Sequence, residues 1–358
     1  MKIRASKEEL KKSLGEAAKA ASAKSPIPAL AGILIKADEE GDVIFTGSSS
    51  DLSIKHTSHD IAVEEPGDVI APLKLIDIIK NISAENITLK SEGDRMTVRG
   101  GRQHYDIPVG RGKDYPRIAF AECEGFTMDC AELCEAIGKT APFTGVLESR
   151  PVLTGVNITS NESGLTFSAT DSYRLSQVRK PAIGVSFHAI VPGKSLETIA
   201  RSMGDEESVT VRVSERLFQA ETEDTIYASR IIEGTYPDIS RLMNFGIYGT
   251  MSVEKSVIAA AIRHAETVVD PRKRIVVIDT GKHVITAESE YGSCEEEFEV
   301  IEETGAPLSV AFDPSFAKQS LAAIDADKVT FVFQGALRPF RIDGDQGCTQ
   351  IILPLAKY

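Results

Sequence analysis

Two short segments of the sequence contain residue types that could carry chemistry. Residues 192–195 (Pro-Gly-Lys-Ser) end like a phosphate-binding loop, in which backbone N–H groups and a lysine hold a nucleotide phosphate. The complete motif needs a glycine where this chain has His188, so we interpret the segment as a strand-to-helix junction. Residues 343–347 begin like a calcium loop, but Pro354 stands where that loop needs a glutamate. Neither segment predicts a nucleotide or calcium site.

Side chains that act as nucleophiles or metal ligands are scattered along the chain. The five cysteines form no Cys-x-x-Cys pair and the six histidines have no paired ligand spacing, so we predict no metal site. A hydrolase that uses Ser172 or Asp171 is one alternative, although the chain has no Gly-x-Ser-x-Gly turn to expose a nucleophilic serine. The pattern favours a non-catalytic binding protein without a cofactor.

Composition and charge narrow the class of protein. The chain has 358 residues, 42% of them hydrophobic, and a net charge of −13 at pH 7. Its apolar runs are shorter than the roughly 18–20 residues that a membrane span needs, and the N-terminus has no apolar signal segment. Together with the cysteine pattern, this predicts a cytoplasmic protein. The negative charge excludes non-specific attraction of the whole chain to DNA, so a DNA contact needs basic residues gathered on one face.

Three features recur with a spacing near 120 residues. The Tyr-Pro pairs at 115–116 and 236–237 are 121 positions apart (236 − 115 = 121). Prolines at 72, 192 and 314 each follow an apolar strand at the start of a predicted helix. A glycine turn between alternating strands recurs at 41, 164 and 281. These repeats predict three similar units, residues 1–120, 121–245 and 246–358.

Each predicted unit has two helices separated by strands. Apolar residues three to four positions apart predict first helices over 6–23, 129–143 and 253–268, and second helices over 73–82, 194–203 and 314–325. Each unit then consists of two β-α-β-β-β halves with antiparallel strands and helices on one side, an α+β architecture. Basic side chains gather on the helices and acidic ones elsewhere. A structural oligomer in which the helical lysines are incidental is a further alternative.

Three segments resemble a known family. Residues 169–175 (Ala-Thr-Asp-Ser-Tyr-Arg-Leu), 230–238 (Arg-Ile-Ile-Glu-Gly-Thr-Tyr-Pro-Asp) and 351–355 (Ile-Ile-Leu-Pro-Leu) resemble the bacterial DNA polymerase III beta sliding clamp. The resemblance extends over the whole chain. It implies a head-to-tail homodimeric ring of six similar units, with helices inside and sheets outside. Such a protein is a non-catalytic processivity factor that tethers the replicative polymerase and other replication and repair proteins to duplex DNA without sequence specificity.

The resemblance also implies a cleft for short peptides of the polymerase, the clamp loader and other partners. The matching apolar and small positions are Leu153, Thr170, Ser172, Leu175, Pro237, Leu242, Ile351, Leu353, Pro354 and Leu355. The matching polar or aromatic walls are Tyr173, Arg174 and Arg241. An apolar cleft with a few polar edges suits a short linear motif. From the residues alone, Leu153, Leu175 and Ile351 fit the protein core equally well.

A ring needs little affinity for DNA, because its topology prevents escape. We expect basic residues on the inner face to attract phosphates without reading bases. The candidates are Lys24, Lys74, Arg150, Lys194 and Arg201. By the resemblance, Lys24 and Lys194 match positions where the family carries DNA-contacting basic residues.

Opposite charges predict the contact between two copies. The strand region 95–113 is rich in arginine, and the region 294–303 is rich in glutamate. Opposite charge on edge strands of different units favours pairing between copies, and two such contacts close a ring. The candidates are Arg95, Arg102, Tyr105 and Ile107 on one edge, and Glu295, Glu297 and Glu299 on the other.

Overall fold

The computed structural model describes residues 1–147, 149–204, 206–244 and 246–356. Two of the predicted unit ends, residues 245 and 358, lie outside these ranges. No helix within the described ranges is long and apolar enough to cross a membrane.

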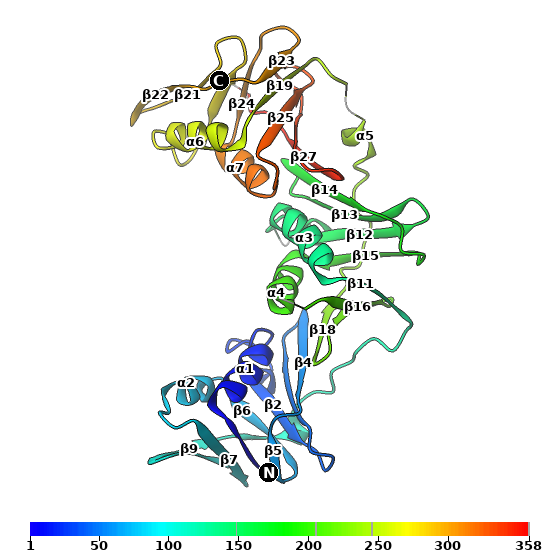
Figure 1. Ribbon diagram of the computed structural model, residues 1–358, viewed down its shortest axis with the longest axis vertical. Helices are drawn as coiled ribbons and strands as arrows, with labels where there is room; N and C mark the ends of the chain where they lie inside the picture. Colours follow the sequence, from blue (N-terminus) through cyan, green and yellow to red (C-terminus); the bar gives the residue numbers. More distant parts are fainter. Residues whose placement is uncertain (148, 205, 245, 357–358) are drawn as a thin grey trace. The chain divides into compact units, whose positions relative to one another are not determined.

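The elements follow the order that the repeats predict (Figure 1). The first repeat contains β1 (Lys2–Ser6), α1 (Lys7–Ala18), η1 (Pro28–Ala31), β2 (Gly32–Ala37), β3 (Val43–Ser48), β4 (Leu52–Ser58), β5 (Ala62–Glu65), β6 (Gly67–Pro72), α2 (Lys74–Asn81), β7 (Asn86–Glu92), β8 (Arg95–Gly100), β9 (Gln103–Pro108), β10 (Gly110–Arg111) and η2 (Gly112–Asp114). The middle repeat contains β11 (Gly125–Asp129), α3 (Cys130–Thr140), η3 (Ala141–Phe143), η4 (Pro151–Thr154), β12 (Gly155–Asn161), β13 (Gly164–Thr170), β14 (Arg174–Lys180), β15 (Phe187–Pro192), α4 (Gly193–Met203), β16 (Ser208–Val213), β17 (Leu217–Glu221), β18 (Thr225–Arg230) and α5 (Ser240–Met243). The last repeat contains β19 (Gly249–Glu254), α6 (Lys255–Glu266), β20 (Val276–Asp279), β21 (Val284–Ser289), β22 (Gly292–Glu297), β23 (Glu302–Thr304), β24 (Ser309–Phe312), α7 (Pro314–Ala322), β25 (Lys328–Phe333), β26 (Phe340–Asp343) and β27 (Cys348–Ile352).

The α+β architecture of paired β-α-β-β-β halves is confirmed. Each first helix is followed by three strands that end in β4, β14 or β22. Each second helix is followed by three strands that end in β9, β18 or β27. The sequence prediction missed the short strands β5, β10 and β23, because segments of two to four residues carry too little alternation to be recognised.

Within the described residues the strands form four antiparallel sheets. The first long sheet has the order β10-β6-β2-β3-β4-β18-β17-β16-β11, and the second has β15-β12-β13-β14-β27-β26-β25-β19-β23. The two short sheets are β5-β1-β7-β8-β9 and β22-β21-β20-β24. Each long sheet therefore joins strands of two successive repeats, through β4–β18 in one and β14–β27 in the other.

The chain divides into two compact bodies that do not follow the repeats. The first comprises residues 1–134 and 194–231, and the second comprises 135–193 and 232–358. Because the long sheets cross the repeat boundaries, the middle repeat contributes to both bodies.

In the first body, helices α1 and α2 pack together against strands of the first long sheet and one short sheet (Figure 1). Ser6 caps α1 by accepting a hydrogen bond from the Glu9 N–H (3.1 Å). Leu10, Leu14 and Leu75 of these helices are fully buried in the shared core. The apolar spacing of the sequence thus defines the buried faces of both helices.

The predicted first helix is too long at its C-terminal end. It ends at Ala18 rather than at residue 23, and Ala21 lies beyond it. The hydroxyl groups of Ser22 and Ser25 accept hydrogen bonds from backbone N–H groups two residues further on, which favours turns over helix.

In the second body, α6 and α7 form the corresponding core. Asp313 caps α7 by accepting a hydrogen bond from the Ser315 N–H (2.8 Å), and Pro314 occupies the first turn. Ile262 and Leu321 are buried among strands of the second long sheet and the other short sheet.

Candidate functional site

Two joints inside the chain show how the sheet of one repeat continues into the next. In each joint, the third strand after a second helix (β18 or β27) pairs with the third strand after a first helix (β4 or β14). His56 Nδ1 lies 2.8 Å from Thr225 Oγ1 across one joint, and Gln350 Nε2 donates to Ser176 Oγ (3.1 Å) across the other. These groups are buried, so a slip in register would leave them without partners.

Burial and the nearby Lys12 ammonium lower the pKa of His56. Its ring is therefore neutral at neutral pH and adds no positive charge to the buried joint. The joint is held by backbone pairing and a neutral hydrogen bond.

Two other strands, β9 and β22, are likewise the third strand after a second helix and after a first helix. Unlike the joint strands, they are edge strands of the short sheets. On β9, Tyr105 and Ile107 are half-buried against the core of the first body. On β22, Cys294 is half-buried, whereas Glu295 and Glu297 are exposed. The structure thus presents a pair of strand edges that carry predicted interface residues.

Some predicted interface residues lie off these edges. Arg95 is on β8, where its Nε donates to the Asp106 carboxylate (2.7 Å), and Arg102 is in the turn that leads into β9. Glu299 follows the end of β22. The region 95–113 is not one strand, because β10 belongs to the first long sheet; likewise β23 belongs to the second. The sequence could not separate strands that follow one another so closely.

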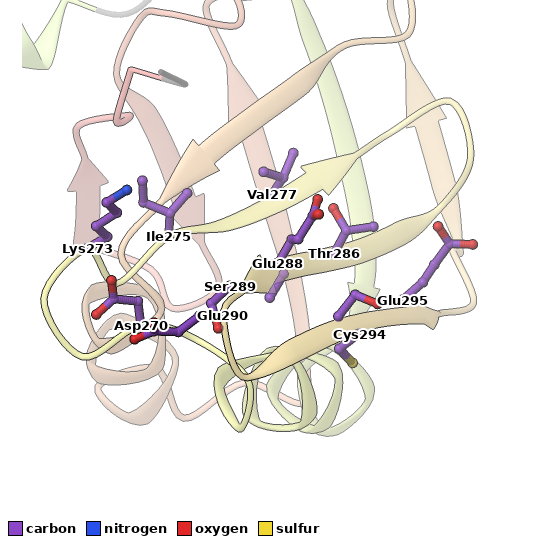
Figure 2. A pocket seen from close by; sticks show the side chains of 12 residues that line it. Asp270, Lys273, Ile275, Val277, Thr286, Glu288, Ser289, Glu290, Cys294 and Glu295 are labelled. Atoms are coloured by element: carbon purple, nitrogen blue, oxygen red, sulfur yellow. The ribbon is translucent and has the colours of Figure 1, made fainter.

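The short sheets differ in charge. A hollow of about 760 Å³ over β20–β22 is lined by Asp270, Glu288, Glu290 and Glu295, with Lys273 at its side (Figure 2). A hollow of about 540 Å³ over β7–β9 is lined by basic and acidic side chains together, namely Lys2, Lys90, Arg95, Arg99, Glu92, Asp94 and Asp106. The first hollow is thus mainly acidic, whereas the second has basic and acidic side chains in nearly equal number.

The turn between β13 and β14 is built by its own polar side chains. The Asp171 carboxylate accepts hydrogen bonds from the N–H groups of Tyr173 (2.9 Å) and Arg174 (3.0 Å). Ser172 has a φ of 81°, a left-handed conformation that is uncommon for serine. Thr170 N–H donates to the Tyr236 hydroxyl (3.0 Å), which connects the turn to the Tyr-Pro segment. Burial raises the pKa of that hydroxyl, so it stays protonated.

Arg174 is clamped rather than free. Its guanidinium lies 4.9 Å from the ring centre of Phe143 and 4.8 Å from that of Phe316, and only 7% of the residue is exposed. Its Nε donates to the Asp171 carboxylate (2.9 Å) and its Nη2 to the Pro142 carbonyl (3.0 Å). Sequence reasoning missed Phe143 and Phe316, because both are remote in the chain and belong to no motif.

Apolar residues of the predicted cleft extend from this turn within the second body. Leu175 and Ile351 are opposite each other across the β14–β27 joint and fully buried, so they belong to the core. Leu153 is buried with Tyr236 in a small cluster. The other predicted positions nearer the surface are Leu242, Leu353, Pro354 and Leu355, which are half-buried, and Tyr173, Ser172, Pro237 and Arg241, which are exposed.

The C-terminal segment is fixed by backbone hydrogen bonds. Leu353 N–H donates to the Tyr173 carbonyl (2.9 Å), and Leu355 N–H donates to the Ala311 carbonyl (2.7 Å). Tyr173 is 60% exposed and stacks on Phe316 with ring centres 6.4 Å apart. Half-buried Leu353 thus lies beside the exposed Tyr173, and Tyr173 and Arg174 both contact the Phe316 ring.

A buried lysine fastens α3 to two loops of the last repeat. Lys139 Nζ lies 2.7 Å from Glu135, 2.9 Å from Asp325 and 2.6 Å from Asp345, and its side chain is 7% exposed. Burial opposes the charged form of Lys139, but hydrogen bonds to these carboxylates raise its pKa above the usual range. Burial likewise opposes ionisation of Asp345, yet the hydrogen bond from Lys139 lowers its pKa.

The predicted DNA-facing residues are all exposed. Lys24 lies in the loop after α1, Lys74 begins α2, and Lys194 is on α4. Lys74 pairs with Asp77 (3.0 Å), Arg201 pairs with Glu197 (2.9 Å), and Arg150 donates to the Ser172 hydroxyl (3.2 Å). The two exposed ion pairs contribute little to stability.

Metal ligands do not gather in this fold as far as it is described. Across residues 1–147, 149–204, 206–244 and 246–356, no three His, Cys, Asp or Glu side chains are arranged to hold an ion.

Three comparisons agree on the kind of protein that this chain resembles. Family models of the DNA polymerase III beta subunit match it in succession: the N-terminal domain over residues 1–119, the central domain over 127–238 and the C-terminal domain over 248–356. A beta sliding clamp of Staphylococcus aureus is 30% identical and that of Bacillus subtilis 27%, with 96% and 100% of both chains covered. The crystal structure of the DNA polymerase sliding clamp from Bacillus subtilis superimposes with a TM-score of 0.95 at 26% identity, over 100% of both chains.

Proposed function

This chain belongs to the DNA polymerase III beta sliding clamp family, and is a non-catalytic processivity factor with the three-domain clamp fold, and we propose that two copies close head to tail around duplex DNA. Family membership associates the chain with DNA and with the polymerase. The observation that carries the proposal is the pair of unjoined strand edges, β9 and β22.

The repeat supplies the rule for joining these edges. β18 of the middle repeat pairs with β4 of the first, and β27 of the last pairs with β14 of the middle. By the same rule, β9 of the first repeat pairs with β22 of a last repeat in another copy. The two short sheets would then form a third long sheet, and two such joints between two copies close a ring of six repeats.

The ladders of the internal joints predict the register of the third. Four residues before each first helix, a ladder of paired residues leads to a joint strand: Ile3–Leu89–Val98–Tyr105, Phe126–Val211–Ala220–Tyr227 and Met251–Phe331–Ile342–Gln350. Tyr227 pairs with Ile54, and Gln350 pairs with Ser176. Ladders of the same kind begin at β6, β15 and β24 and lead to β4, β14 and β22. They give Cys294 of β22 the place that Ile54 has in β4 and Ser176 has in β14. Tyr105 is therefore expected opposite Cys294 of the second copy.

Burial and charge support this register. It sets half-buried Tyr105 opposite half-buried Cys294, and exposed His104 opposite exposed Glu295. One face of the new sheet thus has half-buried residues on both strands, and the other face has exposed residues on both. The register also sets Arg102 opposite Glu297. The opposite charges of Arg102 and Glu297, together with the polar pair His104 and Glu295, favour this partner and this orientation.

A charge-swap experiment tests the joint. Arg102→Glu with His104→Glu places like charges at the joint, and we expect light scattering to report monomers. Adding Glu295→Lys and Glu297→Arg restores opposite charges and should restore the dimer. A dimer that survives the first pair of changes, or a monomer that the second pair does not rescue, would count against the pairing.

We propose that exposed basic side chains of this ring contact the DNA phosphates. Lys24, Lys74, Lys194 and Arg201 are exposed on or beside helices, and Arg150 is exposed in a loop. The family resemblance puts helices on the inner face, where these charges attract the duplex despite the net charge of −13. Because phosphate contacts read no bases, the ring can slide, and we expect it to act in the cytoplasm, where bacterial DNA is replicated.

We propose that partner peptides bind at the half-buried rim around Tyr173. In this proposal the half-buried Leu242, Leu353, Pro354 and Leu355 offer apolar contacts, the exposed Ser172, Pro237 and Arg241 offer polar edges, and Thr170 is buried. Leu153, Leu175 and Ile351 form the floor beneath, and Arg174 is held between two aromatic rings. The polymerase, the clamp loader and other replication or repair proteins are the expected occupants, each through a short apolar motif.

A further inference from the structure

The middle repeat covers a small apolar cluster with two of its own side chains. Leu153, Ile190 and Tyr236 are buried together, and Val152 and Ile232 pack against them. Ile232 is anchored there because its N–H donates to the Ile190 carbonyl (2.7 Å). The cluster is therefore closed by residues of the same chain.

The first repeat has the corresponding cluster, against which Ala29, Leu34 and Ile118 pack, but it has smaller residues at the two positions that Val152 and Ile232 occupy in the middle repeat. Leu30, Ile70 and Tyr115 are buried together, as their counterparts are in the middle repeat. The residue before the cluster leucine is Ala29 instead of valine. Gly110 pairs with Ile70 in the first repeat, whereas Ile232 bonds to the corresponding Ile190 in the middle repeat. A valine and an isoleucine are thus replaced by a methyl group and a hydrogen.

A groove opens where these side chains are missing. Its volume is about 430 Å³, and its lining includes Pro28, Ala29, Ile70, Pro72, Pro108 and Gly110. The strand β10, which carries Gly110, is at one end of the first long sheet, so its backbone borders the groove as a sheet edge. An extended chain can add to such an edge and place one side chain in the hollow.

We propose that this groove, the repeat-1 groove, binds an extended segment of a partner protein that supplies a branched aliphatic side chain in the place that Ile232 occupies in the middle repeat. The charges nearby favour an acidic residue beside it. Three basic residues, Arg111, Lys113 and Arg117, are exposed in this segment. They outnumber two carboxylates, that of Asp114, which is bonded to Arg111 (3.0 Å), and that of Asp68, which lies beside Gly112. The site is separate from the peptide rim around Tyr173, and the proposal does not depend on ring closure.

The test uses a peptide copied from the chain's own covering segment. The probe is an acetylated and amidated peptide with the sequence of residues 229–234 (Ser-Arg-Ile-Ile-Glu-Gly), which carries Ile232 and the acidic residue after it. It is titrated into the full-length protein while the δ1 methyl signal of Ile70 is followed by NMR. We expect a saturable shift, and no shift with a control peptide that carries Ile232→Asp.

A variant whose own side chain fills the groove is the matched control for peptide binding. Gly110→Ile restores the side chain of the middle repeat, and it should weaken peptide binding roughly tenfold or more. A Cβ at this position would lie 3.2 Å from Ile70, so Ala29→Val serves as the second variant if Gly110→Ile does not fold.

Three results would overturn the proposal. The first is the absence of a shift at Ile70 up to the solubility limit of the peptide. The second is an unchanged affinity in a folded variant with a filled groove. The third is a shift of Ile70 on dilution without peptide, because the groove would then be occupied by a second copy of this chain rather than by a partner.

Discussion

A single substitution should link two copies covalently through a native cysteine. The register derived from the internal joints sets Tyr105 opposite Cys294 of the second copy. At the equivalent pair Tyr227–Ile54, the flanking hydrogen bond runs from Thr57 N–H to the Asp224 carbonyl (2.8 Å), so this pair is of the non-hydrogen-bonded type. Such pairs have the closest backbones in an antiparallel ladder, and Tyr105→Cys should therefore form a disulfide with Cys294.

The expected distances make the test sensitive to register. Opposite residues of a non-hydrogen-bonded pair have Cα atoms about 4.5 Å apart, within the disulfide range of about 4.4–6.8 Å. A residue two positions along the strand is about 7–8 Å from the same partner, which is too far without movement of the backbone. Ile107→Cys is thus the matched control on the same face of β9. Loss of the half-buried Tyr105 ring should cost about 2 kcal/mol of stability, which a folded domain tolerates.

The assay is non-reducing electrophoresis after mild oxidation. We expect Tyr105→Cys to run as a covalent dimer that a thiol reductant reverses, Tyr105→Cys with Cys294→Ser to run as a monomer, and Ile107→Cys to link far more slowly. No covalent dimer for Tyr105→Cys, or equal linking by Ile107→Cys, would refute the register and the head-to-tail joint derived from it.

Three further predictions concern stability and the peptide rim. Lys139→Met should lower the free energy of unfolding by about 3 kcal/mol in urea titrations, because it leaves the largely buried Asp345 without its charge partner. The same substitution should also reduce the loss of stability in acid. The pKa values of Glu135 and Asp345 are lowered in the folded protein, so both carboxylates stabilise the fold above their unfolded pKa values and cease to do so as the pH falls through the folded ones. An unchanged pH profile of stability would contradict this. Leu175→Ala with Leu355→Ala should abolish stimulation of the polymerase while light scattering still reports a dimer; full stimulation would exclude the rim as the binding site. Phe316→Ala should weaken binding of a polymerase-derived peptide about fivefold by calorimetry, because Arg174 and Tyr173 lose a stacking partner, and unchanged affinity would argue that this ring is not part of the site.

The sequence predicts the repeated halves because their signals are local. The turn at Gly41 and the proline at 72 act within a few residues, and each recurs in the later repeats. Apolar spacing likewise locates the buried faces of α1 and α6. The end of α1 is missed because Ser22 and Ser25 compete for its backbone through side-chain hydrogen bonds, which spacing does not reveal.

The sites are harder to predict because their residues come from remote segments. Arg174 is in a recognisable motif, but its burial depends on Phe143 and Phe316, and no sequence pattern relates these aromatic residues to it. Charge alone indicates an arginine-rich and a glutamate-rich region, yet it cannot tell that Arg95 points back to Asp106. The register of the third joint needs the paired ladders of the structure, since one residue of slip would exchange the two faces.

The most direct test of the account is retention of the protein on DNA of different topology. Loaded onto nicked circular DNA by its clamp loader, the protein should stay bound through gel filtration, and it should be lost once a restriction enzyme linearises the circle, because a closed ring can then slide off the ends. Equal retention on circular and linear DNA would show that the protein grips the duplex rather than encircles it, and would contradict the central claim.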